Sequence, residues 1–313
     1  MPLSKPLPDA SSPRTESEPG RQRLPQWLRV KLPQTPDFAE TSAVVARHGL
    51  DTVCRGARCP NIFQCFSQGV ATFLILGRVC TRGCAFCNIS PGSPQPLEPD
   101  EPARVAQAVS RLGLKHVVIT SVTRDDLPDG GAGRFAAVIR AVRQEAPGCG
   151  VEVLVPDFQG RQQDLQTVLE AGPDVLNHNL ETVPSLYRAV RPKAVYQASL
   201  ALISRARAWG QGIKTKSGLM VGLGETREEL ARVLADLAGA GCHMVTVGQY
   251  LRPSRRNLAV ARYVHPDEFK EIEALGLSLG VPVMYCGPLV RSSHQAGALL
   301  DDLDRAKLSR PLK

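Results

Sequence analysis

The chain has 313 residues, of which 43% are hydrophobic and 22% are charged, as in an ordinary soluble globular protein. No run approaches the roughly 20 apolar residues of a membrane span, and the first residues lack a secretory signal, so we expect a cytoplasmic protein with no membrane partner. The net charge of +8 indicates either an acidic partner or simply a basic solvated surface, and no basic block interleaved with aromatics predicts nucleic-acid binding.

The first 25 residues are rich in proline, serine and charge, and this composition predicts a disordered tail. Its serines and arginines also resemble an organelle transit peptide, but the acidic residues Asp9, Glu16 and Glu18 count against that interpretation. We therefore place the folded part of the chain after this tail.

Residues 26–70 form a predicted N-terminal extension that carries three cysteines, Cys54, Cys59 and Cys65, spaced C-x4-C-x5-C. This spacing is too wide for a zinc knuckle, whereas three thiolates from one stretch can hold an iron–sulfur cluster that lacks one local protein ligand. Because no secretion signal is present, clustered thiols are expected to bind a metal or act in catalysis rather than form disulfides.

A second set, Cys80, Cys84 and Cys87, forms a C-x3-C-x2-C loop directly after the first predicted strand. Three thiolates on so short a loop can bind three corners of a cubane cluster and leave one iron open to a small molecule. Structural zinc would instead require four ligands in paired C-x2-C knuckles, and only one such pair is present. The other cysteines, Cys149, Cys242 and Cys286, lie among apolar neighbours and are expected to be small buried side chains.

From residue 71 to residue 286 short β-type runs alternate with amphipathic helical patterns. The predicted strands are 71–76, 116–122, 151–155, 175–180, 215–221 and 244–250, and the predicted helices are 103–112, 133–145, 161–170, 197–209 and 226–239. Thr226 and Glu229 predict a capping box at the start of the last of these helices.

Six successive βα units without a linker predict an α/β fold, specifically a partial (β/α)6 TIM-type barrel, with a doubly wound open sheet as the alternative. Polar residues gather at the carboxyl ends of the strands, which is the rim where such barrels carry their active sites. These residues are Thr120, Ser121, Asp157, Asn177, Asn179 and Gln249. Residues 287–313 are expected to form a C-terminal segment that closes over the cluster held by Cys54, Cys59 and Cys65.

The cysteine loop at residues 80–87 resembles that of the radical S-adenosylmethionine superfamily, and the upstream C-x4-C-x5-C motif resembles that of the lipoyl synthase family. Further segments that resemble this family are 120–132, 178–183, 218–225, 249–254 and 285–293. The resemblance implies two [4Fe–4S] clusters and S-adenosylmethionine as cofactors. It also implies that Ser293 is the fourth ligand of the second, auxiliary cluster, in the sequence Arg291-Ser292-Ser293-His294, where the family usually has tyrosine at the position of His294.

The same resemblance implies contacts to S-adenosylmethionine. Phe86 would lie near the adenine, although packing in the core explains an aromatic there equally well. Glycines between a strand and a helix, Gly130, Gly131, Gly222 and Gly224, would let the backbone approach the cofactor. Asn179, Glu181 and Arg191 would bind its polar groups, and a surface ion pair is the alternative for the last two.

By resemblance, the reaction inserts sulfur from the auxiliary cluster at C6 and C8 of an octanoyl group on a protein lysine. The implied substrates are the lipoyl domains of 2-oxoacid dehydrogenase complexes and the glycine-cleavage H protein. Ferredoxin or flavodoxin would supply electrons, and an iron–sulfur carrier protein is a further expected partner. The alternatives are a biotin-synthase-like sulfur-insertion enzyme, a non-catalytic iron–sulfur regulator and a zinc-only structural protein.

Overall fold

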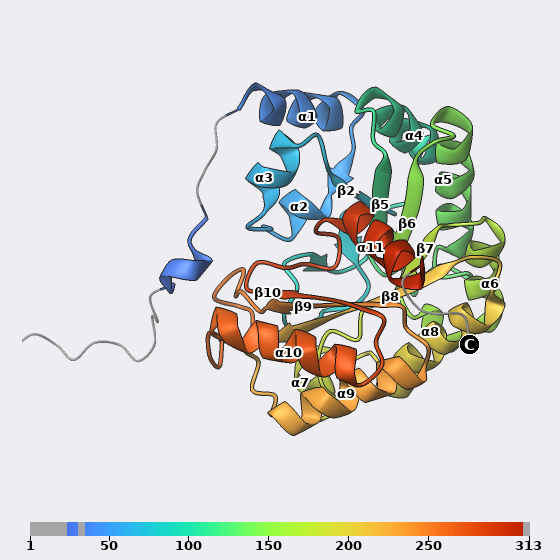
Figure 1. Ribbon diagram of the computed structural model, residues 1–313. Coiled ribbons are helices and arrows are strands. Elements are labelled where there is room, and N and C mark those ends of the chain that lie inside the picture. Colours follow the sequence, from blue (N-terminus) through green and yellow to red (C-terminus); the bar gives the residue numbers. More distant parts are fainter. Residues whose placement is uncertain (1–23, 31–34, 309–313) are drawn as a thin grey trace, which may run out of the picture.

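The computed structural model describes residues 24–30 and 35–308, so the predicted disordered tail lies almost wholly outside the described residues. A large sheet is surrounded by helices, and the chain ends with a helix laid against it (Figure 1). Within the described ranges, no helix is both long enough and apolar enough to span a bilayer.

The main sheet contains eight strands in the order β1-β2-β5-β6-β7-β8-β9-β10. All neighbours pair in parallel except β1 (Asp51–Thr52), which runs antiparallel to β2 and stands at one end of the order. The parallel strands are β2 (Thr72–Ile75), β5 (His116–Ser121), β6 (Gly150–Leu154), β7 (Val175–Asn177), β8 (Lys214–Val221), β9 (Met244–Gln249) and β10 (Val283–Gly287). The predicted α/β fold with a mostly parallel sheet is confirmed, but the prediction of six strands missed β1 and β10.

The predicted helices follow their strands and cover the outside of the sheet (Figure 1). They are α4 (Glu101–Arg111), α5 (Ala132–Glu145), α6 (Gln162–Glu170), α8 (Tyr196–Trp209) and α9 (Arg227–Gly239), to which the structure adds α10 (Pro266–Ser278). The capping box of α9 is confirmed, because the Thr226 hydroxyl accepts from the Glu229 amide and the Glu229 carboxylate accepts from the Thr226 amide.

Short elements complete the chain. In the N-terminal extension these are α1 (Pro36–Arg47), α2 (Val53–Gly56), α3 (Ile62–Ser67) and a 3-10 turn (Gln26–Leu28). Beside the sheet lie the pair β3 (Val79–Cys80) and β4 (Ser90–Pro91), α7 (Tyr187–Val190) and 3-10 turns at Phe158–Gly160 and Pro184–Leu186. The last helix, α11 (Ala296–Leu308), packs Leu299 and Leu303 against the first residues of β7, β9 and β10. It therefore covers the amino ends of these strands, opposite the predicted rim.

A charged pair lies inside the sheet, where an apolar core would be expected. Lys216 on β8 donates to both carboxylate oxygens of Glu152 on β6, at 3.0 and 3.2 Å, and Asn177 on β7 donates to the same carboxylate at 3.1 Å. All three side chains are fully buried. Burial by itself would raise the pKa of Glu152, but the charges and hydrogen bonds of Lys216 and His116 together outweigh burial and hold this pKa below its usual value.

Replacing Lys216 alone is expected to destabilise the fold, because Lys216→Met leaves the Glu152 carboxylate buried without its partner. The cost should be about 3–5 kcal/mol, whereas the double variant Lys216→Met/Glu152→Leu should recover most of the loss. Urea denaturation of the two variants and the parent, under identical anaerobic conditions, checks this. An unchanged midpoint for the single variant would show that the pair does not stabilise the sheet.

Candidate active site with two cysteine sets

A cavity of about 480 Å³ lies at the carboxyl ends of the parallel strands. Strands β2, β5, β6, β8 and β9 all contribute to its wall, together with the cysteine loop and the C-terminal segment. Four of the six predicted rim residues line it: Thr120, Ser121, Asn179 and Gln249. The other two lie nearby with other partners, since Asp157 binds an arginine and Asn177 binds Glu152.

The loop with Cys80, Cys84 and Cys87 forms one side of this cavity. Backbone amides already point at its sulfur atoms: the Cys80 Sγ accepts from the amides of Arg82 and Thr123, and the Cys87 Sγ accepts from that of Ile89, at 3.3–3.4 Å. Such donors stabilise thiolate charge and are one means by which a protein tunes a cluster's potential.

Arg82, inside this loop, fixes it to the strand ends. Its guanidinium donates two hydrogen bonds to Asp125 and two to Asp157, all at 2.7–2.8 Å. The hydrogen bonds to Arg82 hold the pKa of Asp125 below its usual range. Burial would raise the pKa of Asp157, but the hydrogen bonds and charge of Arg82, with the hydrogen bond from the Gln159 amide, together lower it. On the far side of the loop, Asn257 donates to the carbonyls of Ala85 and Cys87.

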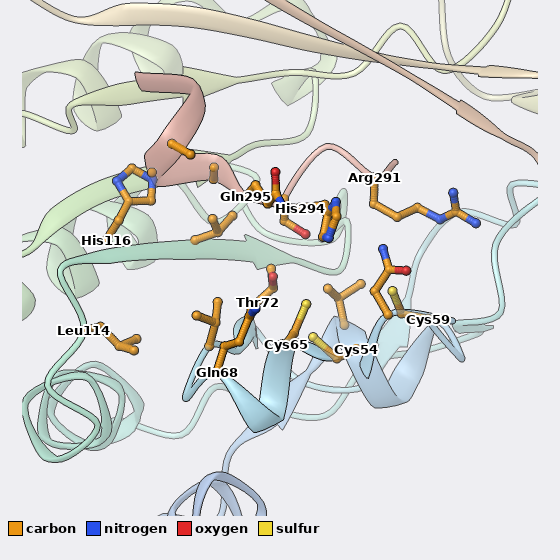
Figure 2. A pocket seen from close by; sticks show the side chains of 18 of the residues that line it. Cys54, Cys59, Cys65, Gln68, Thr72, Leu114, His116, Arg291, His294 and Gln295 are labelled. Carbon is orange, nitrogen blue, oxygen red and sulfur yellow. The ribbon is translucent and has the colours of Figure 1, made fainter. Parts of the chain in front are cut away.

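The other cysteine set borders a second cavity, of about 590 Å³ (Figure 2). Cys54 lies in α2, Cys65 lies in α3 and Cys59 lies between these helices, so the short helices bring the three sulfurs together. Ser293 and Arg291 line both this cavity and the first one, as does Cys59. Ser293, the predicted fourth ligand, thus lines the same cavity as Cys54, Cys59 and Cys65.

The C-terminal segment reaches the cavities through contacts with distant parts of the chain. Asn61, in the N-terminal extension, donates to the Leu289 carbonyl at 2.7 Å, and Asn179 donates to the Ser292 hydroxyl at 3.2 Å. At Gly248 on β9, a Cβ atom would lie 2.1 Å from the Val290 carbonyl oxygen. Only glycine therefore lets this segment lie directly over the strand.

Each thiol set brings three sulfur ligands to the wall of a cavity, a donor set that suits an iron–sulfur cluster. In the described part of the chain, no three His, Cys, Asp or Glu side chains converge as ligands of one ion, although each set lines a cavity. Burial raises the pKa of Cys54 to about 11, and burial together with the neighbouring Cys54 and Cys59 raises that of Cys65 to about 12. Bound iron would compensate this cost by stabilising the thiolates.

Asn179, Glu181 and Arg191 line the first cavity beside the cysteine loop. Arg191 donates to the carbonyls of Asn179 and Leu180. Its Nε, the Asn179 Oδ1 and the Ser121 Oγ are buried and find no hydrogen-bond partner among the described residues. Buried polar atoms are costly unless a ligand satisfies them. Glu181 also adopts a positive φ of 67°, which is strained for a side chain of this kind and typical of functional sites. The polar wall therefore fits a polar cofactor such as S-adenosylmethionine.

Of the remaining residues predicted to contact the cofactor, some line the first cavity and others do not. Phe86 lines the first cavity, whereas none of the four glycines belongs to its wall. Gly131 begins α5 with a φ of 92°, where a Cβ would lie 2.4 Å from Leu76, and a Cβ on Gly222 would lie 2.2 Å from the Gln249 amide nitrogen. Gly130 directly precedes Gly131 and has a φ of 60°, and Gly224 lies two residues after Gly222 and has a φ of 113°. These positions support turn and packing roles, and cofactor contact by the glycines remains a prediction.

His294, the residue that departs from the family pattern, lines the second cavity (Figure 2). Its ring stacks on that of Tyr285. Burial lowers its pKa, so the ring is neutral. An aromatic ring is thus retained where the family has tyrosine.

Three cysteines outside the two sets were predicted to be buried. Cys149 and Cys242 are buried, but Cys286 near the end of β10 is only partly buried.

Sequence reasoning did not single out Arg82, Asp125, Gly248 or Asn257. Arg82 and Asp125 stand in the motif segments 80–87 and 120–132, but no pattern paired a charge in one with a charge in the other. Their roles depend on loops that are distant in sequence and adjacent only in the fold.

Comparison with known proteins agrees with this site. The Radical SAM superfamily matches residues 74–237. A lipoyl synthase of Oleidesulfovibrio alaskensis is 58% identical over 280 residues, covering 90% of this chain and 96% of the relative. Lipoyl synthases of Nitratidesulfovibrio vulgaris (57%, covering 92% of this chain and 94% of the relative) and Rubrobacter xylanophilus (51%, covering 93% and 91%) are similarly close.

Solved structures share the fold at low identity. SuiB of Streptococcus suis, bound to its precursor peptide SuiA, aligns with a TM-score of 0.53 at 10% identity, over 80% of this chain and 52% of SuiB. HydG, a maturase of the [FeFe]-hydrogenase, aligns with a TM-score of 0.52 at 18% identity, over 67% of this chain and 49% of HydG. This chain therefore spans about half the length of either structure, and the likeness concerns the fold alone.

Gly248→Ala is expected to unseat the C-terminal segment, because its Cβ would overlap the Val290 carbonyl. Hydrogen–deuterium exchange should become faster over residues 288–293, and the anaerobically reconstituted protein should retain less iron. Gly148→Ala is the matched control, since that exposed position has no atom within 4 Å of the added carbon. Equal exchange in the two variants would contradict the proposed close contact.

Proposed function

The chain belongs to the lipoyl synthase family of radical S-adenosylmethionine enzymes, and on that premise we propose how its residues divide the work. As an enzyme of this family it transfers sulfur to an octanoyl group and forms a lipoyl group. The observation that carries the proposal is that two three-cysteine sets border adjoining cavities that share Ser293 and Arg291 in their walls.

Cys80, Cys84 and Cys87 would hold the radical-generating [4Fe–4S] cluster. When bound, this cluster would supply the electron for reductive cleavage of S-adenosylmethionine, the family's source of radical chemistry at unactivated carbon. The chain's own part is to bind and orient the cofactor: Arg191 and Asn179 offer unsatisfied polar atoms, and Glu181 adds a carboxylate at the same wall. Arg82 keeps the cysteine loop in register with the strand ends.

Cys54, Cys59 and Cys65 would hold the auxiliary [4Fe–4S] cluster, with Ser293 as its fourth ligand. This cluster would be the source of the inserted sulfur. A serine oxygen is a hard ligand on a metal that prefers thiolate, so this corner would be held less firmly than the other three. That difference suits a cluster that gives up sulfide during the reaction.

The first cavity also suits an acyl chain. Apolar side chains of Leu74, Leu154, Met220, Tyr250 and Val290 contribute to its wall together with the polar groups described above. An octanoyl chain inserted there would lie between the two cysteine sets, away from bulk water. The acyl-lysine would belong to a lipoyl domain of a 2-oxoacid dehydrogenase complex or to the glycine-cleavage H protein.

Three further assignments complete the proposal. Ferredoxin or flavodoxin would supply the electrons, an iron–sulfur carrier protein would serve the auxiliary site, and the enzyme would act in the cytoplasm.

The direct test of the function is mass spectrometry of an octanoyl-lysine peptide incubated without oxygen with reduced enzyme and S-adenosylmethionine. The expected product carries two added sulfur atoms, whereas a biotin-synthase-like enzyme or a non-catalytic regulator would leave the peptide unchanged.

Single cysteine substitutions should separate the two sets. Cys84→Ala should abolish cleavage of S-adenosylmethionine, because the radical cluster would lose one of three ligands. Cys59→Ala should retain that cleavage but form no lipoyl product, and reconstituted wild-type protein should hold about eight irons. Chromatography of 5′-deoxyadenosine and of the peptide product, with Cys149→Ala as a control outside both cavities, checks this. Lipoyl product from Cys59→Ala would refute the sulfur-donor assignment.

A further inference from the structure

Four exposed arginines stand at or beside the mouth of the first cavity, and we call them the arginine rim: Arg58, Arg252, Arg255 and Arg256. Arg58 and Arg252 belong to the cavity wall. Arg58 comes from the N-terminal extension and the other three come from the segment after β9, and Arg58 joins the two by donating to the Pro253 carbonyl at 3.3 Å.

The rim is a concentration of positive charge without compensation. Among the described residues, no carboxylate lies within ion-pair distance of any rim arginine, whereas the exposed Arg78, Arg227 and Arg262 each pair with an acidic side chain. The hydrogen bonds that the rim side chains donate go to backbone carbonyls, such as that from Arg256 to Asn88 at 3.2 Å. These bonds orient the side chains and leave their charge unbalanced.

Local geometry holds the rim against this mutual repulsion. Arg58 adopts a positive φ of 52°, a conformation that costs about 1–3 kcal/mol for a residue with a side chain. The segment that carries the other three is fixed to the cysteine loop, because Asn257 donates to Ala85 and Cys87 and the Leu258 amide donates to Ala85. Strained and anchored cations at a cavity mouth indicate a binding surface rather than a solvated face.

The small cofactor does not account for these charges. Its carboxylate needs one cationic partner, and Arg191 already offers one inside the cavity with an unsatisfied Nε. The octanoyl chain is uncharged. What remains is the protein that bears the acyl-lysine, whose surface must meet the cavity mouth when the chain is inserted.

We propose that the arginine rim is the docking surface for the acyl-carrying substrate protein, and that this partner presents an acidic surface around its modified lysine. The proposal rests on the proposed function, since it assumes an acyl-lysine on a protein. Opposite charges at the edge of an interface mainly raise the association rate and fix the orientation of the partner, and both effects weaken as salt screens them. The rim should thus affect the KM for the carrier protein and leave kcat unchanged.

The test compares two substrates of one reaction, an octanoylated lipoyl domain and a short uncharged peptide with the same octanoyl-lysine. Arg255→Glu is the variant of choice, because Arg255 lies outside the cavity wall and its guanidinium makes no hydrogen bond or ion pair with the described residues. Arg140→Glu, on the exposed face of α5, makes the same change in net charge away from the cavity.

With Arg255→Glu, the KM for the lipoyl domain should rise about fivefold at low salt, and raising the salt should remove the difference from wild type. The KM and kcat for the peptide should stay at the wild-type values, and Arg140→Glu should match wild type with both substrates. Turnover of the peptide also shows that the variant is folded and holds its clusters.

Three results would overturn the proposal while leaving the proposed function intact. One is an unchanged KM for the lipoyl domain, and another is a parallel rise with the peptide or in the Arg140→Glu control. The third is inhibition of peptide turnover by RNA that Arg255→Glu relieves without a change in the KM for the domain, which would assign the rim to nucleic acid. Failure of the proposed function is distinct, because wild-type enzyme would then convert neither substrate.

Discussion

The fork of hydrogen bonds from Arg82 to Asp125 and Asp157 is the constraint on which the site depends. Arg82 stands between two cysteines of one loop, while its partners follow β5 and β6, so a single side chain ties the loop to the sheet. A planar guanidinium that meets two carboxylates fixes orientation as well as distance. Because Arg82 is buried, removing it would leave the carboxylates of Asp125 and Asp157 without their counter-charge, and the loop has little freedom to move.

Everything else in the site is positioned relative to that fixed loop. The segment after β9 reaches it through Asn257, and the same segment meets the N-terminal extension through Arg58. The extension in turn holds the C-terminal segment through Asn61. Four stretches that are far apart in the sequence thus surround one cavity, and hydrogen bonds between loops maintain their arrangement where no sheet pairing reaches.

The sequence predicted those parts that repeat a local pattern. Alternating β-type and amphipathic runs identified β2 and β5 to β9, and the Thr226–Glu229 pair identified the start of α9. The cysteine spacings identified both thiol sets, and resemblance placed Ser293 beside one of them. By contrast, β10 was missed because Val283–Gly287 is a short run that shows no alternation of apolar and polar residues.

Other features could not be predicted because each depends on a contact between two residues that are distant in the sequence. A lysine in a strand, such as Lys216, suggests an exposed edge until the fold brings Glu152 to it across β7. Gly248 has no special backbone angle, and only the passage of Val290 above it explains the missing side chain. In both cases the cause is a contact between residues dozens of positions apart, which no local pattern encodes.

The two adjacent serines of the C-terminal segment show how little chain is needed to join the two cavities. Ser292 accepts a hydrogen bond from Asn179 in the wall of the first cavity, and Ser293 lines the second cavity as well as the first. Neighbouring side chains of an irregular segment point in different directions, so two consecutive hydroxyls can reach both sites from one stretch of backbone. A displacement of this segment would therefore change the polar wall of the first cavity and the position of Ser293, the proposed auxiliary ligand, together. Gly248 permits the close backbone contact that holds both in place.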